Sequence, residues 1–430
     1  MSLAKICLRF VRRELIAVAA LIFCAAVVFL TPSYAQTYTV LHNFSGGADG
    51  SYPNAGLTLN GTANLFGAAG ENTIFRLRLM NGIWVFMPIY QFSGDDGGFL
   101  SGRLTVGPGG ALYGASSFGG VPDCRDGAGC GLILSLRPPR TVCKTTACDW
   151  SQSTIYEFNP LNRFGDGYGP NGGLVFDGSG NIYGTTQTGG SANAGTVFMA
   201  SPAQGGGWTE TSLYEFQYSA DGAEPNGNLV IDHSGNLIGT AATGGMGDNR
   251  CIGDFCGVVF QMTHTSSGWV QSILHTFTYS DGANPSGGLI SDAAGNLYGN
   301  TSHGGTNGGG TVYELSPSNG GYTFHVLYNF TGSASQSGPA GILALDSSGN
   351  LYGATYSEGA VGQGNIFKLT HSGNQWIYSN LHDFAGGADG SGPADGPTLD
   401  PSSNLYGTAT FGGTSNNCPS GCGVVWEIRP

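Results

Sequence analysis

Asn296-Leu297-Tyr298-Gly299 is one copy of a short pattern that recurs along the chain and decides its fold. Each copy is a short run that ends in an aromatic residue followed by Gly, with Ile in the aromatic position of one copy. The seven copies cover residues 64–67, 111–114, 181–184, 236–239, 296–299, 350–353 and 404–407. Their glycines are 47, 70, 55, 60, 54 and 54 residues apart. A period near 55 residues predicts an array of small repeated units.

Each repeat is predicted to contain four short strands. The first strand is apolar on both faces and ends in Asp, as in residues 173–177, which indicates burial on both sides. An Asp-x-x-Gly-Asn turn follows, in which Asp binds nearby backbone and Gly takes a positive φ. The second strand is the recurring pattern, the third resembles residues 195–198, and the fourth ends in Leu-Tyr/His-x-Phe, as in residues 376–384.

The first and last repeats complement each other. The seventh repeat ends with a third strand at residues 423–429, whereas residues 38–44 match a fourth strand in their Leu-His-x-Phe ending. A ring in which the N-terminal strand closes the last blade removes free sheet edges. We therefore predict an all-β, seven-bladed β-propeller of four-stranded antiparallel blades, built by residues 36–430 as one domain. An open solenoid of the same units is the alternative.

Composition excludes several other classes of protein. Gly supplies 76 of 430 residues and charged residues only 10 %, whereas coiled coils and helical bundles are built from Ala, Leu, Glu and Lys. Hydrophobic residues make up 40 % and aromatic residues 11 %, which is enough for a large core and excludes simple disorder. The glycines do not recur at every third residue, so a collagen is excluded as well.

Residues 1–35 have the layout of a secretory signal peptide. A basic start with four Lys or Arg residues precedes an apolar run over residues 15–30, and Ser33-Tyr34-Ala35 places small residues at the cleavage positions. The run has about 16 residues, fewer than the roughly 20 that a membrane span needs, so we expect cleavage after Ala35 rather than a retained anchor. The mature chain is expected to have no membrane span and to be secreted, periplasmic or at the cell surface.

The charge balance bears on possible partners. The whole chain has a formal net charge of −13, and removal of the signal takes away four basic groups and one acid, which leaves −16. Such a surface repels phosphate backbones, so no nucleic-acid partner is expected. The acidity fits solubility outside the cell or weak cation binding, and we expect a monomer.

The repeat signatures are similar to those of a known family. Leu-His-x-Phe, Asp-Gly-x-x-Pro, Asp-x-x-Gly-Asn-Leu-Tyr-Gly-Thr-Thr and Gly-Thr-Val-Phe resemble the GloVer tandem-repeat proteins of bacteria, over essentially all of residues 37–430. The resemblance implies an exported bacterial protein and supplies no catalytic residues. Members of the family often carry a C-terminal sorting anchor, an expectation that does not extend to this chain because Pro430 directly follows a predicted strand.

The cysteines of the mature chain form four local pairs. These are Cys124/Cys130, Cys143/Cys148, Cys251/Cys256 and Cys418/Cys422. An even number in an exported chain implies disulfides, and each pair is predicted to bridge locally. The alternative is a four-cysteine zinc site built from the first two pairs. The strand assignment opposes it, because the loops that carry these two pairs leave opposite ends of a sheet.

Asp-Gly-x-x-Pro is the most regular polar feature and precedes each first strand. Asp49, Asp166, Asp221, Asp281 and Asp389 belong to this motif, repeat two keeps Asp96 without the Pro, and Ser335 replaces Asp in repeat six. One interpretation is a ring of carboxylates that binds Ca²⁺ or a polyhydroxylated ligand. The other is that each Asp caps backbone N–H groups of its own turn, which the repetition favours. No other cofactor is expected.

Functional residues of a repeat protein are expected where the repeats differ. Aligned on their last residue, the first strands begin with Gly56, Arg103, Gly173, Asn228, Gly288, Ile342 and Gly396. Arg103 stands out as a basic group at the mouth of the central channel, and Glu224 is a second outlier on the same face. Arg103 is suited to bind a carboxylate or a sugar acid. The alternative is an ion pair with a neighbouring acid.

The sequence contains no nucleophile elbow, phosphate loop or dinucleotide fingerprint in a suitable context. We therefore favour an exported, non-catalytic propeller scaffold that binds an extracellular or envelope ligand, either a glycan or a protein. One alternative is a secreted polysaccharide lyase or hydrolase that uses Arg103 with acidic loop residues, for which two carboxyls about 5–10 Å apart are needed. Another is a structural cell-surface component.

Overall fold

The structure is a computed structural model that describes residues 36–430 except 71, 101, 123, 125–126, 140–149, 160–165, 246–249, 252–255, 333–337 and 374. The predicted signal peptide lies outside the described residues, as do Cys143, Cys148 and Ser335. The fold reported below is that of the compact unit Tyr38–Arg429.

The described residues form an all-β protein with 29 strands in six hydrogen-bonded sheets and one short 3-10 turn, η1 (Pro108–Gly110). Three sheets contain four strands that are consecutive in sequence. They are β2 (Thr58–Asn60), β3 (Asn64–Ala69), β4 (Thr73–Met80) and β5 (Ile83–Gln91); β6 (Thr105–Val106), β7 (Leu112–Ser116), β8 (Leu132–Arg137) and β9 (Ser151–Glu157); and β23 (Pro339–Leu345), β24 (Leu351–Thr355), β25 (Asn365–Ser372) and β26 (Gln375–Asp383).

The other sheets are larger or combine both ends of the chain. A five-stranded sheet holds β10 (Gly167–Pro170), β11 (Val175–Phe176), β12 (Ile182–Gly189), β13 (Thr196–Pro202) and β14 (Trp208–Glu215). An eight-stranded sheet holds β15 (Ala223–Ile231), β16 (Leu237–Thr243), β17 (Val258–Thr265), β18 (Gly268–Thr276), β19 (Ala283–Ser291), β20 (Leu297–His303), β21 (Thr311–Ser318) and β22 (Gly321–Asn329). The sixth holds β1 (Thr37–Asn43), β29 (Val424–Arg429), β28 (Leu405–Ala409) and β27 (Thr398–Leu399).

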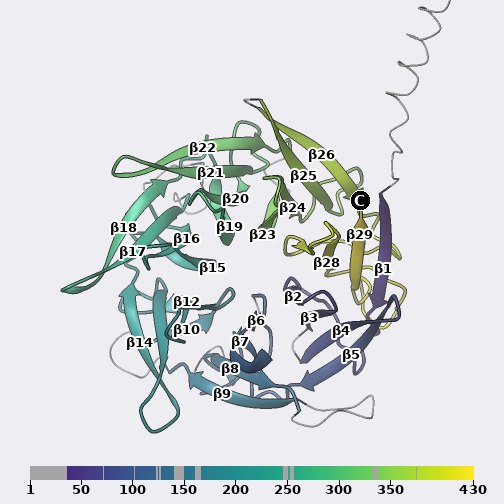
Figure 1. Cartoon of the computed structure of the whole chain (residues 1–430), viewed down its shortest axis with the longest axis horizontal. Coiled ribbons are helices and arrows are strands. Elements are labelled where there is room, and N and C mark those ends of the chain that lie inside the picture. Colours follow the sequence, from purple (N-terminus) through teal and green to yellow (C-terminus); the bar gives the residue numbers. More distant parts are fainter. Residues whose placement is uncertain are drawn as a thin grey trace, which may run out of the picture. The chain divides into compact units, whose positions relative to one another are not determined.

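The sheets follow one another around a centre in a propeller-like arrangement (Figure 1). First strands such as β15 and β23 lie towards the centre, and fourth strands such as β18 and β26 lie on the outside (Figure 1). The N-terminal β1 pairs with β29, as the sequence predicts. The structure has six hydrogen-bonded sheets, whereas seven separate sheets are predicted from the sequence. The difference arises because one parallel pair, Asn228 with Gly288, joins β15 to β19 and so links eight strands.

The hydrophobic core lies between neighbouring sheets. Phe66 and Ile74 of one sheet, for example, share a buried cluster with Leu132 and Leu136 of the next. The fourth strands end at a buried phenylalanine that enters these clusters: Phe44, Phe92, Phe158, Phe216, Phe277, Phe330 and Phe384. The apolar residues on both faces of the inner strands are therefore explained by packing against a sheet on each side.

The tight turns after the first strands confirm the predicted turn chemistry. Asp177 Oδ1 accepts hydrogen bonds from the backbone N–H of Ser179 at 2.8 Å and of Asn181 at 2.9 Å, and Gly180 has a φ of +85°. Burial acts to raise the pKa of Asp177, but the hydrogen bonds from Asn181 and its neighbours hold that pKa below its ordinary value. The Asp is thus an ionised cap of its own turn.

Three of the predicted disulfides are present. Cys124–Cys130, Cys251–Cys256 and Cys418–Cys422 each close a loop between a second and a third strand. The bond between Cys124 and Cys130 excludes the alternative four-cysteine zinc site, because disulfide sulfurs are not thiolate ligands.

Candidate ligand-binding site

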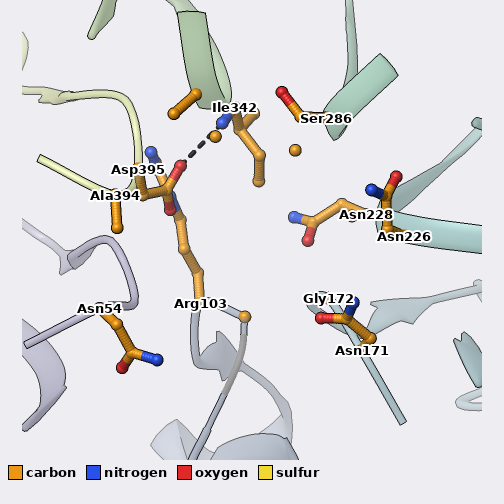
Figure 2. A pocket seen from close by; sticks show the side chains of 15 residues that line it. Asn54, Arg103, Asn171, Gly172, Asn226, Asn228, Ser286, Ile342, Ala394 and Asp395 are labelled. Carbon is orange, nitrogen blue, oxygen red and sulfur yellow. Dashed lines mark hydrogen bonds and ion pairs between the residues drawn. The ribbon is translucent and has the colours of Figure 1, made fainter. Parts of the chain in front are cut away.

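The first strands begin around a central pocket with a volume of about 200 Å³ (Figure 2). Its walls are chemically uneven. The lining combines amide and hydroxyl groups with the apolar residues Ala340, Ile342 and Ala394. The polar uncharged residues are Asn54, Asn171, Asn226, Asn228 and Ser286.

Glycine lets the backbones of neighbouring repeats meet at the pocket wall. A Cβ on Gly172 would lie 2.2 Å from the carbonyl oxygen of Gly227, and a Cβ on Gly227 would lie 2.2 Å from the backbone nitrogen of Gly288. Gly227 also has a φ of +76°. Side chains are therefore excluded at these positions, and the polar groups of the pocket come from the residues beside them.

Arg103 and Asp395 form an ion pair at the pocket, with Nε 2.7 Å from Oδ2 (Figure 2). Arg103 also donates from Nη2 to the carbonyl oxygen of Gly396 at 2.7 Å and from Nη1 to Thr398 Oγ1 at 3.1 Å. The two side chains are only 16 % and 10 % exposed. Arg103 thus forms an ion pair with an acid, as one of the two interpretations of the sequence expects.

Asp395 connects several repeats through both carboxylate oxygens. Oδ2 accepts the N–H of Gly56 at 3.0 Å as well as Arg103, and Oδ1 accepts the N–H of Ile342 at 2.7 Å. These donors belong to the first, second and sixth repeats, whereas Asp395 belongs to the seventh. The carboxylate thus joins backbones that are distant in sequence, and its charge is matched by Arg103.

The amide side of the pocket is less fully engaged with the protein. Asn228 Oδ1 accepts the N–H of Gly173 at 2.6 Å, so its Nδ2 remains to face the pocket. Asn171 and Asn228 direct their amides towards the open centre (Figure 2). The buried Oδ1 of Asn54 has no hydrogen-bond partner within the described part of the chain. Amides arranged in this way can donate to and accept from an uncharged polar ligand.

The Asp-Gly aspartates cap their own loops. Asp49 Oδ2 accepts the N–H of Ser45 at 2.9 Å and lies 3.1 Å from His42 Nε2. Three further aspartates accept a backbone N–H and also the hydroxyl of a Tyr from the preceding fourth strand: Asp96, Asp166 and Asp221. The remaining two accept a backbone N–H and lie beside a histidine, Asp281 beside His275 and Asp389 beside His382. None of the six belongs to the lining of the central pocket in the described residues.

The pKa shifts of Asp49 and His42 follow from their contacts. Burial acts to raise the pKa of Asp49, but hydrogen bonds from Ser45 and His42 hold it below its ordinary value. Burial lowers the pKa of His42 despite the nearby carboxylate. The carboxylate therefore stays ionised and accepts hydrogen bonds from a neutral imidazole.

Glu224 lies away from the other candidate residues. It has a φ of +53°, and its Oε1 is 3.4 Å from Tyr218 Oη. It does not line the central pocket. Arg103 is therefore accompanied there by one acid, Asp395, and not by Glu224 or the loop aspartates.

Neither a metal-ion site nor a membrane-spanning helix is found among the described residues. No three His, Cys, Asp or Glu side chains among them come together as a metal-ion site. Within the same residues, no helix is both long enough and apolar enough to span a bilayer.

Asp395 and the asparagines were missed in the sequence, although a signal exists. Asp395 occupies a position held by Ala55, Gly102, Gly172, Gly227, Gly287 and Gly341 in the other repeats. One position earlier, Asn54, Asn171 and Asn226 differ from Ala340 and Ala394. The repeat comparison that singled out Arg103 would have found both, had it covered the two preceding positions.

An all-β ring of sheets around a polar centre defines a propeller-like repeat protein. The profile of the Gloeobacter/Verrucomicrobia repeat matches residues 139–324 and 252–430, and the chain belongs to this family. The predicted resemblance is thereby confirmed. No curated protein sequence matches the chain.

Solved structures with a similar fold come from several bacteria. The extracellular domain of a protein described as a one-component system from B. thetaiotaomicron has a TM-score of 0.50 at 12 % identity, over 90 % of this chain and 40 % of that one. PorZ, a surface component of the type-IX secretion system of Porphyromonas gingivalis, has a TM-score of 0.49 at 14 % identity, over 91 % and 48 %.

A Thermus thermophilus protein described as a glucose dehydrogenase-type oxidoreductase has a TM-score of 0.45 at 14 % identity, over 92 % of this chain and 100 % of that one. At these identities the likeness concerns the fold alone.

Proposed function

We propose that this protein is an exported, non-catalytic propeller whose central pocket binds a neutral saccharide. The observation that carries the proposal is the division of the pocket between a satisfied ion pair and a group of amides. Arg103 and Asp395 are occupied with each other and with backbone, while the amides of Asn171 and Asn228 face the centre (Figure 2). Amides match sugar hydroxyls as both donors and acceptors.

The size and the apolar residues of the pocket support this ligand class. A volume of about 200 Å³ is below the 300–1,000 Å³ or so of sites for drug-sized ligands, and suits a single sugar ring. Ala340 and Ile342 offer a surface for the C–H groups of such a ring. A glycosidase would need two carboxyl groups at the pocket, whereas the described residues of the lining include one acid, Asp395, which is paired with Arg103.

For the architecture, we propose seven blades, with the eight-stranded sheet counted as two. The single bridge between Asn228 and Gly288 supports this division. So does the apolar cluster that contains Val259 and Leu315, because it packs the two halves of that sheet face to face. Each of the other six clusters lies between successive repeats, including the last with the first.

Export after Ala35 as residues 36–430 is also part of the proposal. The disulfides support an oxidising compartment. We propose that Glu224 and the six Asp-Gly aspartates, like Arg103, bind no ligand directly, so that ligand binding needs no Ca²⁺.

A glycan array followed by calorimetric titration tests the function. Arrayed neutral and acidic saccharides, with and without Ca²⁺, are expected to give a neutral ligand that binds equally in both conditions. Asn171→Ala, which introduces the residue that repeats six and seven carry, should weaken binding at least tenfold. Asn319→Ala, an exposed asparagine in an outer loop, is the matched control and should bind normally. Binding only to acidic sugars, or equal binding by Asn171→Ala, would contradict the proposal.

A further inference from the structure

Tyr52, Phe99 and Tyr218 are aromatic residues with a backbone conformation that suits glycine, and the first two occupy the same position of their repeats. Tyr52 and Phe99 have φ values of +50° and +42°, in the loop that leads into the first strand. The same position in other repeats also has a positive φ: it is +61° at both Gly169 and Gly392, +53° at Glu224 and +54° at Asn284. A bulky side chain is a true outlier in this region of backbone space. Such strain persists where the surrounding structure enforces it and clusters at binding sites.

Tyr52 and Phe99 are each paired with a second aromatic residue. The rings of Tyr52 and Phe411 have centroids 5.7 Å apart, and those of Phe99 and Phe118 are 5.4 Å apart. Phe118 and Phe411 occupy one equivalent position, directly before Gly-Gly, where other repeats have Thr188, Thr243 and His303. All four rings are partly exposed. At these two places, therefore, both residues of the contacting pair are aromatic.

The pairs lie close to the central pocket along the chain. Tyr52 is two residues before Asn54, and Phe99 is three residues before Gly102, both of which line the pocket. Two residues of extended chain span at most about 7 Å. Phe118 in addition lines a second cavity of about 570 Å³ together with Ser93 and Asp95. An elongated ligand that leaves the pocket would therefore pass these rings.

We propose that the Tyr52–Phe411 and Phe99–Phe118 pairs are stacking subsites for a saccharide chain whose end occupies the central pocket. This inference rests on the proposed function and extends it from one sugar ring to an oligosaccharide. Aromatic rings offer large, rigid apolar faces, and the C–H face of a neutral pyranose is complementary to them. The aromatic pairs supply contact area, and the pocket amides supply hydrogen bonds.

Tyr52 packs against the buried cluster between the last and the first repeat, but the loop does not require this ring. Glycine occupies the Tyr52 position in other repeats and keeps their loops intact, as the hydrogen bond from Gly392 N–H to Gln363 O at 2.8 Å shows. The Tyr52 N–H makes the equivalent bond to Cys422 O, also at 2.8 Å. The loop therefore needs the backbone conformation and not the ring.

Replacement by glycine separates binding from stability. Tyr52→Gly and Phe99→Gly relieve the backbone strain of the positive φ, which offsets the lost ring packing, so their melting temperatures should stay close to that of the unchanged protein. Calorimetric titration would use oligomers of glucose and of N-acetylglucosamine, each from one to four residues long. The unchanged protein is expected to bind a tetramer at least tenfold more tightly than the monomer. Each glycine variant should lose most of that gain and keep the monomer affinity within twofold.

Asn284→Gly is the matched control, because it removes a non-glycine residue with a φ of +54° at the same position of another repeat. It should leave the affinities for all lengths unchanged. If monomer and tetramer bind equally well, or if the tetramer gain survives in both glycine variants, the stacking proposal is wrong and the proposed function stands. If no oligomer of either sugar binds at any length, both proposals are wrong.

Discussion

The polar side chains of the central pocket fall into two groups: a charged pair that contacts the protein, and amides that face the open centre. On one side, the charged groups of Arg103 and Asp395 are consumed by each other and by backbone from several repeats. On the other side, Asn171 and Asn228 direct amide groups into the open centre (Figure 2). The most conspicuous outlier of the repeat alignment therefore holds neighbouring repeats together, and the less conspicuous substitutions beside it are the ones to which we assign ligand binding in the proposed function.

The largest loss of stability is expected when Asp395 is removed from its ion pair with Arg103. Asp395→Ala leaves the largely buried guanidinium of Arg103 without its carboxylate partner, and removes the acceptor for the N–H groups of Gly56 and Ile342. We expect a loss of about 3–5 kcal/mol in the free energy of unfolding, measured by urea denaturation. The double variant Arg103→Gly, Asp395→Gly carries at each position a residue that other repeats have, and should recover part of that loss. A loss below about 1 kcal/mol in Asp395→Ala would show that the pair does not hold neighbouring repeats together.

Glu210 is a partly buried carboxyl group that, unlike Asp395, has no ion pair with Lys or Arg in the described residues. Burial, and then the charge of Asp166, raise its pKa from 4.5 to about 8, and its Oε1 is buried without a hydrogen-bond partner in the described residues. Gln152 and Gln271 occupy the same position in neighbouring repeats and donate to the carbonyl oxygens of Asp96 and Asp221. A glutamine should therefore satisfy this position at any pH.

The pH dependence of Glu210→Gln follows from the raised pKa. The folded state holds a proton that the unfolded state releases above pH 4.5, so the unchanged protein loses stability as pH rises from 4.5 to 8. The glutamine variant should lack this loss and be more stable by about 1–3 kcal/mol at pH 8, after allowance for partial exposure. Urea unfolding at pH 5 and pH 8 measures the difference. An equal stability gap at both values would refute the assignment.

Asn228 both faces the open centre (Figure 2) and holds the fold through its hydrogen bond with Gly173 N–H. Asn228→Gly introduces the residue found in most repeats at this position, but removes the acceptor for Gly173 N–H. We expect a loss of about 1 kcal/mol in the free energy of unfolding. Thermal unfolding followed by circular dichroism would record it. A cost as large as that of Asp395→Ala would remove the distinction between the two sides.

Asn171 should give the smallest change in stability. Asn171→Ala alters a side chain whose counterparts in repeats six and seven are already Ala, so we expect a change within about 0.5 kcal/mol. Differential scanning calorimetry is sensitive enough to show it. A strongly destabilised variant would mean that this amide belongs to the framework rather than to a binding surface.

Much of the fold could be predicted because its determinants are local and repeated. The Asp177 turn and the paired cysteines Cys418 and Cys422 each act within a few residues. The pairing of β1 with β29 was also predictable, since only one repeat lacked a fourth strand. The bridge between Asn228 and Gly288 was not, because it depends on how closely two inner strands approach each other.

The site was only partly predictable for a related reason. Arg103 could be recognised as an outlier, but its partner lies 292 residues away, and no local pattern links the two. The arrangement of the ring brings them together. The Asp-Gly motif indicated loop caps correctly because each aspartate contacts its own loop, whereas a binding residue contacts a ligand and leaves no such partner in the sequence.

A crystal structure of the protein with its best neutral saccharide tests the central claim most directly. We expect a sugar ring in the central pocket, hydrogen-bonded to Asn171 and Asn228, with the Arg103–Asp395 pair intact. A ligand bound through Arg103 with that pair broken, or bound away from the central pocket, would contradict the proposed function.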